Sequence, residues 1–241
     1  MNKHTLISVI FLTLIISIKV SAFRMEPMDV DFTPDGEGAS KIFRIENEGD
    51  EKVAVKISAY TREIDDKGKE TRVVSNDFKI YPEQMTLSAS DSRAVRVLYI
   101  GPKQLEQESA YRIVATQLPV EFKKKTKKSG VSFLYEFVAS VYVTDEKFVP
   151  KIEVESITRT SKDNLKIKVI NKGQKHTLLR NVKIELKDSE GKYLPMDGKL
   201  IKEWDSENIL SGTRRTFNIK STQNFDLSIN PPKIEVKDEL K

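Results

Sequence analysis

The chain has 241 residues, 38% hydrophobic and 32% charged, which suits one or two globular domains and excludes a disordered tail. It has no cysteine and only two histidines, His4 and His176, so disulfides, zinc fingers and thiol nucleophiles are excluded. Few reactive side chains remain for acid–base or metal chemistry. We therefore expect no enzyme, with no catalytic residues, no metal site and no cofactor.

The first 22 residues are typical of a secretory signal peptide. Lys3 gives the N-terminal region a positive charge, and residues 6–18 form an apolar run. Ala22 is a small residue that precedes the expected cleavage site before Phe23. A membrane anchor is the alternative, but the run is shorter than the roughly 20 residues that a spanning helix needs. We expect an exported protein without membrane insertion.

Basic residues do not indicate a nucleic-acid partner. The formal net charge is +5 at pH 7, and it falls to +3 without Lys3 and Lys19 of the expected signal peptide. The one dense basic run has five lysines between residues 123 and 128 and lies between two strand-like segments. It lacks the interleaved aromatic side chains that stack on bases, so a solvated hairpin loop is favoured over a polyanion site.

Apolar and polar residues alternate with period two after the expected signal peptide, which predicts β-strands. The expected strands are, in order, 28–32, 41–46, 53–59, 78–81, 94–100, 111–118 and 130–143. Turn sequences such as Pro34-Asp35-Gly36 separate them. Seven short strands at this spacing predict an immunoglobulin-like sandwich.

A second series of strand-like segments follows Pro150, at 152–157, 165–170, 182–186, 209–210, 217–219 and 225–229. In each half a strand runs into Asn-x-Gly, at Asn47 and at Asn171, which is weak support for a repeat. The predicted fold is all-β, with two tandem immunoglobulin-like β-sandwich domains. The expected division is a signal peptide at 1–22, an N-terminal domain at 23–148 and a C-terminal domain at 149–241. His176 lies in a polar turn and is expected to be a solvated loop residue.

The segment from Glu108 to Pro119 resembles the signature of the periplasmic pilus (fimbrial) assembly chaperones of the chaperone-usher pathway. In that family, as here, a Glu-Ser pair and an aromatic residue lead into a strand that ends in an apolar residue and proline. The similarity extends back to Ile80-Tyr81-Pro82 and forward to 130–143. It covers nearly the whole N-terminal domain, so the chain is identified as a divergent member of the family.

This resemblance implies an ATP-independent chaperone in the periplasm that supports pilus assembly at the cell surface. Its partners would be pilin-like subunits, which it completes by donating a β-strand, and an outer-membrane usher. No glycine-rich phosphate loop occurs in the sequence, so nothing indicates nucleotide-driven action. The alternative is a structural or adhesive β-sandwich protein of the envelope without chaperone activity.

The donated strand would be the last strand of the first domain. An apolar stripe at spacing two supplies the candidate subunit-binding residues, Val131, Phe133, Tyr135 and Phe137. The same residues are equally suited to the core of their own domain, because periodicity does not tell which face is donated. Leu134 and Val138 make the opposite face partly apolar and leave both interpretations open.

The family anchors the subunit's terminal carboxylate with an arginine on the first strand and a lysine on the last strand of the first domain. Asp29 and Ser140 occupy the matching positions here, or Met28 and Ala139 if the alignment is shifted by one residue. None of these can pair with a carboxylate as a cation does. The chain either anchors its client differently, through Arg24 or Lys147, or has lost carboxylate anchoring.

Overall fold

The computed structural model describes residues 23–120, 133–161, 164–179, 182–185, 207–220 and 233–236. The expected signal peptide, the lysine run and Val131 lie outside these ranges. The described residues form strands and turns, with one short 3-10 helix, η1 (Glu37–Ala39). None of these ranges contains a helix long and apolar enough to span a bilayer. The all-β prediction is confirmed.

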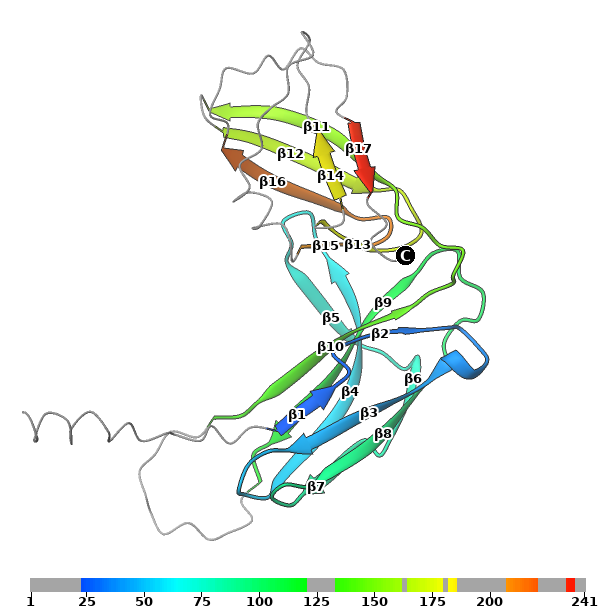
Figure 1. Ribbon diagram of the computed structural model, residues 1–241, viewed down its shortest axis with the longest axis vertical. Helices are drawn as coiled ribbons and strands as arrows, with labels where there is room; N and C mark the ends of the chain where they lie inside the picture. The colour runs from blue at the N-terminus through cyan, green and yellow to red at the C-terminus, as the bar shows by residue number, and fades with distance from the viewer. Residues whose placement is uncertain are drawn as a thin grey trace, which may run out of the picture.

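The N-terminal domain is a sandwich of two sheets (Figure 1). The first sheet has the order β1-β3-β8-β6 and consists of β1 (Phe23–Glu26), β3 (Ser40–Asn47), β8 (Ser92–Tyr99) and β6 (Phe78–Tyr81). The second has the order β2-β10-β9-β4-β5 and consists of β2 (Asp29–Phe32), β10 (Glu136–Val143), β9 (Ser109–Leu118), β4 (Val53–Ile64) and β5 (Glu70–Val74). Strand β7 (Gln84–Leu87) also pairs with β4. The chain thus crosses from one sheet to the other between β1 and β2.

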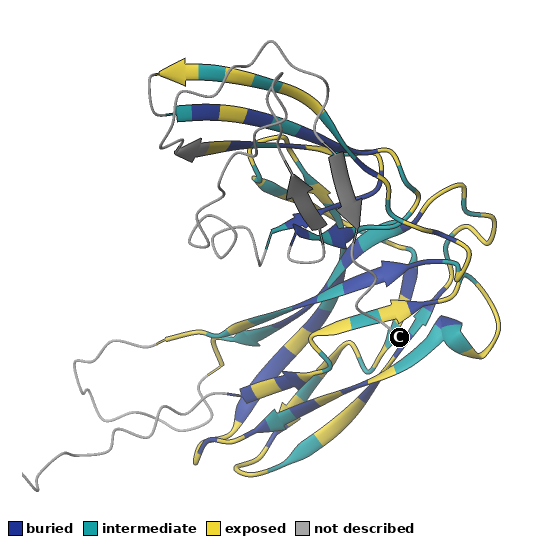
Figure 2. Ribbon diagram, turned by 45° about the horizontal axis from the view of Figure 1, so that its top comes forward, coloured by how far each residue is buried: buried dark blue, intermediate teal, exposed yellow. Residues whose placement is uncertain are grey.

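Alternation along the strands builds the core between the sheets. Phe43 and Val95 from the first sheet and Ile113 and Val141 from the second are completely buried. Figure 2 shows buried and exposed residues alternating along several of these strands. Each sheet therefore has one apolar face turned inward and one face turned to solvent or to the second domain.

Three strands of the N-terminal domain were not expected from the sequence, β1, β5 and β7. Most side chains of β5 are exposed, because β5 ends the sheet order and pairs only with β4. A strand exposed on both faces needs no apolar period, so the alternation that revealed its neighbours is absent. The predicted strand 130–143 is shorter in the structure: β10 begins at Glu136.

The second domain is also built of strands. Three of them form an antiparallel sheet, β11 (Ile152–Ser161), β12 (Asn164–Asn171) and β16 (Arg214–Lys220). Two short pairs accompany it: β13 (Thr177–Leu178) with β15 (Asn208–Ile209), and β14 (Val182–Glu185) with β17 (Lys233–Val236). Leu165, Ile167 and Val169 of β12 are completely buried. The predicted boundary between residues 148 and 149 falls between β10 and β11 and stays a prediction.

The two Asn-x-Gly sequences form the same turn in both domains. Asn47 Oδ1 accepts the backbone N–H of Gly49 at 3.0 Å, and Asn171 Oδ1 accepts that of Gly173 at 3.0 Å. Each side-chain amide then donates to the carbonyl four residues later, at 2.8 Å from Asn47 and 2.7 Å from Asn171. Both asparagines are completely buried. The weak sequence repeat therefore corresponds to a repeated structural motif.

The domains meet at an angle, with strands β9 and β10 running up to the junction (Figure 1). The hairpin between β4 and β5 also reaches the second domain, where the Asp66 carbonyl accepts the backbone N–H of Thr216 at 2.7 Å. The outer face of the second sheet of the N-terminal domain is therefore bordered by the C-terminal domain.

Candidate functional site

Strand β10 has a partly free edge. It pairs with β9 along its whole length but with β2 only from Ser140 to Val143. The Ser140 N–H donates to the Met28 carbonyl at 2.8 Å, whereas the Tyr135 carbonyl accepts from β9, from the Gln117 N–H at 2.9 Å. The residues of β10 with even numbers thus direct their backbone N–H and C=O groups away from β9.

The backbone groups of Leu134, Glu136 and Val138 consequently lie along an edge without a partner strand among the described residues. We call this segment the free edge of β10. Unpaired N–H and C=O groups in an extended row are a template for a further strand.

The candidate donor residues lie in different environments. Phe133 is 70% exposed. Tyr135 and Phe137 are half-buried and pack against the core of their own domain, and the Phe137 ring meets Phe23 edge to face at 4.9 Å. Val131 falls outside the described residues. On the opposite face, Leu134 is 54% exposed.

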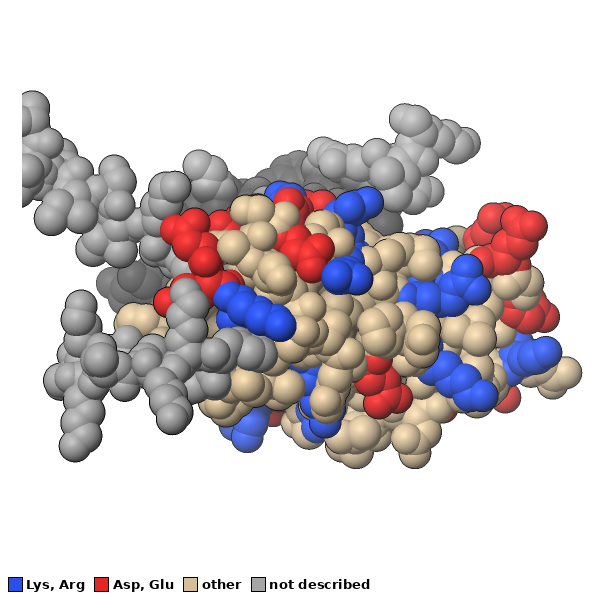
Figure 3. Space-filling model, turned by 90° about the horizontal axis from the view of Figure 1, so that it is seen from below, with Lys and Arg blue, Asp and Glu red and all other residues tan. Residues whose placement is uncertain are grey.

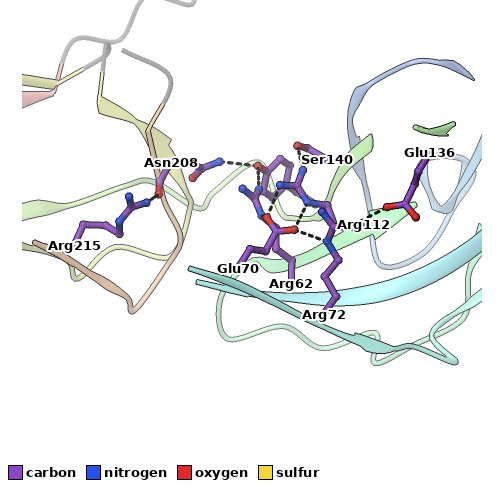
Figure 4. A network of polar contacts seen from close by, with 9 residues as sticks. Arg62, Glu70, Arg72, Arg112, Glu136, Ser140, Asn208 and Arg215 are labelled. Carbon is purple, nitrogen blue, oxygen red and sulfur yellow. Dashed lines mark hydrogen bonds and ion pairs between the residues drawn. The ribbon is translucent and has the colours of Figure 1, made fainter. Parts of the chain in front are cut away.

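A cluster of arginines lies on the outer face of the same sheet (Figure 4). The Glu70 carboxylate at the start of β5 accepts from Arg62 Nε at 2.8 Å, Arg72 Nε at 2.6 Å, and Arg112 Nε and Nη2 at 3.0 and 2.5 Å. The side chains of Arg62 and Arg112 are only 8% and 13% exposed. We call Arg62, Arg72 and Arg112 the arginine cluster.

The electrostatics of Glu70 follow from these contacts. Burial pushes the pKa of its carboxyl upward, but hydrogen bonds from Arg112 and Arg72 outweigh burial and lower the pKa to about 2. Glu70 is therefore ionised at neutral pH, and it compensates the charges of Arg62 and Arg112, which are largely shielded from water.

The arginine cluster is connected to the second domain through Tyr142 of β10. The Tyr142 hydroxyl accepts from Arg62 Nη1 at 2.8 Å and from Asn208 Nδ2 at 2.7 Å. The Asn208 carbonyl in turn accepts from Arg215 Nη1 at 2.9 Å, so one polar network spans both domains (Figure 4).

His176 does not lie in a solvated loop as predicted. Its side chain is 16% exposed, and its Nδ1 lies 2.6 Å from Oε1 of Glu108, whose side chain is 1% exposed. The imidazole also stacks on the Tyr142 ring, with centroids 3.7 Å apart and planes 9° apart. The sequence prediction failed because the residues that cover His176 belong to the other domain.

Asp29 and Ser140, which the sequence predicts to match the family's basic pair, are neighbours. Ser140 lies opposite Asp29 on β2 and opposite Arg112 on β9. Arg112 Nη1 donates to Ser140 Oγ at 2.5 Å. Burial raises the pKa of Asp29, while the charges of Arg62 and Arg112 act in the opposite direction. Arg112 carries no signal for this role in the sequence, because only strand pairing brings it beside Ser140.

The two candidate anchors named from the sequence lie elsewhere. Arg24 is on the outer face of the other sheet, where it pairs with Glu46 at 3.0 Å. Lys147 is 70% exposed and lies 3.2 Å from Asp145, after the end of β10. Neither contacts the arginine cluster through a hydrogen bond or ion pair that the described residues contain.

Charges on the lower face of the N-terminal domain are mixed. Figure 3 shows Lys and Arg side chains interspersed with Asp and Glu over a largely uncharged surface. Within the part of the chain that the structure describes, no group of three or more His, Asp or Glu side chains is placed to hold a metal ion.

Residues 24–139 match the family model of the pili and flagellar-assembly chaperone, PapD N-terminal domain. No curated protein sequence matches the chain significantly.

Solved structures share the fold of both domains. A chain of the CsuC–CsuE chaperone–tip adhesion subunit pre-assembly complex, from archaic chaperone-usher Csu pili of Acinetobacter baumannii, has a TM-score of 0.55 and 13% identity, over 82% of this chain and 90% of that one. The class 5 fimbriae chaperone CfaA also gives 0.55, at 15% identity, over 90% and 99%. A chain of the complex of Salmonella enterica SafA pilin with the SafB chaperone gives 0.55 at 12% identity, over 90% and 97%. The prediction of two immunoglobulin-like domains is confirmed.

Proposed function

We propose that this chain, which belongs through its N-terminal domain to the pili and flagellar-assembly chaperones, binds pilin-like subunits in the periplasm by donating strand β10. Its family is one of chaperones, not of enzymes. The observation that carries the proposal is the free edge of β10, where the backbone of Leu134, Glu136 and Val138 is available to a partner strand.

Strand donation follows from elementary energetics. A subunit that lacks one strand exposes both an unpaired sheet edge and an apolar groove, and each is costly in water. The free edge of β10 supplies the hydrogen bonds, and alternate side chains fill the groove. Phe133, at 70% exposed, is available without loss of packing in its own domain.

The remaining stripe residues contribute unequally in this proposal. Val131 and Tyr135 continue the apolar row on either side of Phe133. Phe137 keeps its contact with Phe23 and holds the donated strand to its own domain. An outer-membrane usher receives the loaded subunit. Residues 1–22 direct export of the chain. Recovery of Phe23 as the mature N-terminus tests this export step.

Arg112 takes the place of the missing basic pair as the anchor of the subunit's C-terminal carboxylate. The free edge of β10 ends at Ser140, where β2 begins to pair in parallel, and Arg112 contacts Ser140 directly. A subunit strand that adds parallel to β10, before β2, would therefore end beside the Arg112 guanidinium. Arginine binds a carboxylate with two N–H groups at once, which suits this role.

The test is capture of a pilin-like subunit co-expressed from a gene beside that of the chaperone. Phe133→Ser should abolish co-purification of the subunit and leave thermal unfolding unchanged, since Phe133 is exposed. Val74→Ser is the matched control, because Val74 is 68% exposed on β5, away from the free edge. If the Phe133 variant still captures the subunit, the donor role of this residue is wrong. If the unaltered chain captures none, the structural or adhesive alternative is favoured.

A further inference from the structure

The carboxylate-binding capacity of the arginine cluster is already in use in the free chain. Both oxygens of Glu70 are bonded, Oε1 to Arg72 and Arg112 and Oε2 to Arg62 and Arg112. Arg112 contributes two parallel N–H groups, the geometry in which a guanidinium binds one carboxylate most strongly. A second carboxylate therefore cannot obtain the same contacts while Glu70 stays in place.

The location of Glu70 favours exchange. It is the first residue of β5, and β5 lies at the end of its sheet and pairs with β4 alone. The following residues Thr71, Arg72, Val73 and Val74 are exposed. Few packing contacts thus oppose a new rotamer of Glu70, whereas Arg112 is held within the sheet between β10 and β4.

We infer that Glu70 is an internal competitor, which occupies Arg112 in the free chaperone and gives way to the C-terminal carboxylate of a bound subunit. The inference rests on the proposed function, because it names what regulates that same site. Two carboxylates that share one guanidinium repel each other, so binding of the subunit terminus requires Glu70 to leave. Exchange of one ion pair for another makes the net gain smaller than that of an unopposed ion pair, which favours later release of the subunit.

The opposing interpretation is that Glu70 only holds the arginines in place. The two interpretations predict opposite effects of Glu70→Gln, which preserves the size of the side chain and removes its charge. If Glu70 is a competitor, its replacement raises the affinity of the chain for an external carboxylate. If Glu70 only positions the arginines, its replacement lowers that affinity.

The experiment uses two fluorescent peptides with the same alternating Val and Thr sequence, one with a free C-terminal carboxylate and one with a C-terminal amide. Binding to the full chain is followed by fluorescence anisotropy. We expect Glu70→Gln to bind the free-acid peptide about tenfold more tightly than the unaltered chain does, with the amide peptide unaffected. Arg112→Gln should abolish the preference for the free acid.

Glu46→Gln is the matched control, since Glu46 pairs with Arg24 at 3.0 Å on the other sheet and the change removes the same charge from an ion pair outside the arginine cluster. It should leave the preference for the free acid unchanged. If Glu70→Gln folds poorly because the arginines repel one another, Glu70→Gln combined with Arg72→Gln removes one charge of each sign, and the same gain is expected.

Equal or weaker binding of the free acid by these Glu70 variants overturns the inference, and so does a failure of both peptides to bind any variant. The proposed function is judged separately, by co-purification of a subunit and its loss in Phe133→Ser. Subunit capture without a gain from Glu70→Gln therefore refutes the competitor and leaves strand donation standing.

Discussion

Arg112 and Ser140 lie opposite each other on adjacent strands, and the guanidinium Nη1 donates to the serine Oγ at 2.5 Å. Ser140, which the sequence predicts to match the family's lysine, is thus in contact with an arginine from the neighbouring strand. Because Arg112 projects from β9 and not from β10, a cation is present beside the end of the free edge although the expected position is neutral.

The first prediction concerns this contact. Arg112→Gln should reduce capture of a co-expressed subunit at least tenfold, since an arginine–carboxylate pair shielded from water is worth more than about 1.4 kcal/mol. Arg24→Ala and Lys147→Ala, which remove exposed cations outside the arginine cluster, should have little effect. Quantitative co-purification compares the three variants. A loss confined to Arg24→Ala or Lys147→Ala would instead support the anchors named from the sequence.

The second prediction concerns pH. The pKa of Glu70 is lowered to about 2 from an ordinary value of 4.5, so the unfolded chain binds a proton at this residue before the folded chain does. The stability that ionised Glu70 contributes is therefore complete above about pH 4.5 and is lost as the pH falls toward 2. At about 1.4 kcal/mol per pKa unit, reduced by partial exposure, we expect about 1 to 3 kcal/mol.

Urea unfolding of the unaltered chain and of Glu70→Gln from pH 2 to pH 7 measures this contribution. The difference in free energy of unfolding between the two should be constant above about pH 5 and should shrink toward pH 2. Other carboxyl groups titrate in both proteins and cancel. A difference that does not vary with pH would show that the charge of Glu70 contributes nothing.

The third prediction concerns the junction of the domains. His176→Phe keeps a ring to stack on Tyr142 but removes the side-chain partner of Glu108. Oε1 of Glu108 then keeps only the backbone N–H of residue 176, at 3.1 Å, and Oε2 already lacks a hydrogen bond among the described residues. A buried carboxylate deprived of a partner should cost about 1 to 3 kcal/mol of stability. Combining His176→Phe with Glu108→Leu should restore part of this loss in urea unfolding. Equal stability of the single and double variants would argue against the contact.

The fourth prediction compares the repeated turns. Asn47→Ala and Asn171→Ala each remove a buried amide that bonds several backbone groups, so each should cost about 1 to 3 kcal/mol or more. Asn218→Ala, at an exposed position of β16, is the matched control and should change stability by less than about 0.5 kcal/mol. Thermal unfolding of the three variants provides the comparison. A negligible effect at either buried position would contradict the structural role of that turn.

Much of the fold could be predicted from local sequence. The alternation of apolar and polar residues predicts strands β3, β4 and β9, because burial of one face of a strand selects apolar residues at every second position. The resemblance of residues 108–119 to pilus chaperones is likewise a local pattern, and the family match to residues 24–139 confirms it. Strand β5 was not predicted, because an exposed edge strand shows no alternation of apolar and polar residues.

The sequence by itself determined the fold class, the resemblance of the first domain to pilus chaperones and the strand that carries the free edge, since these depend on residues that are close together in the chain. Only the tertiary structure decided which charges meet. Arg62, Glu70 and Arg112 come from three different strands, and strand register sets their contact. The burial of His176 likewise required the second domain to pack against the first. Contacts between distant residues depend on pairing and docking, which periodicity along the chain does not specify.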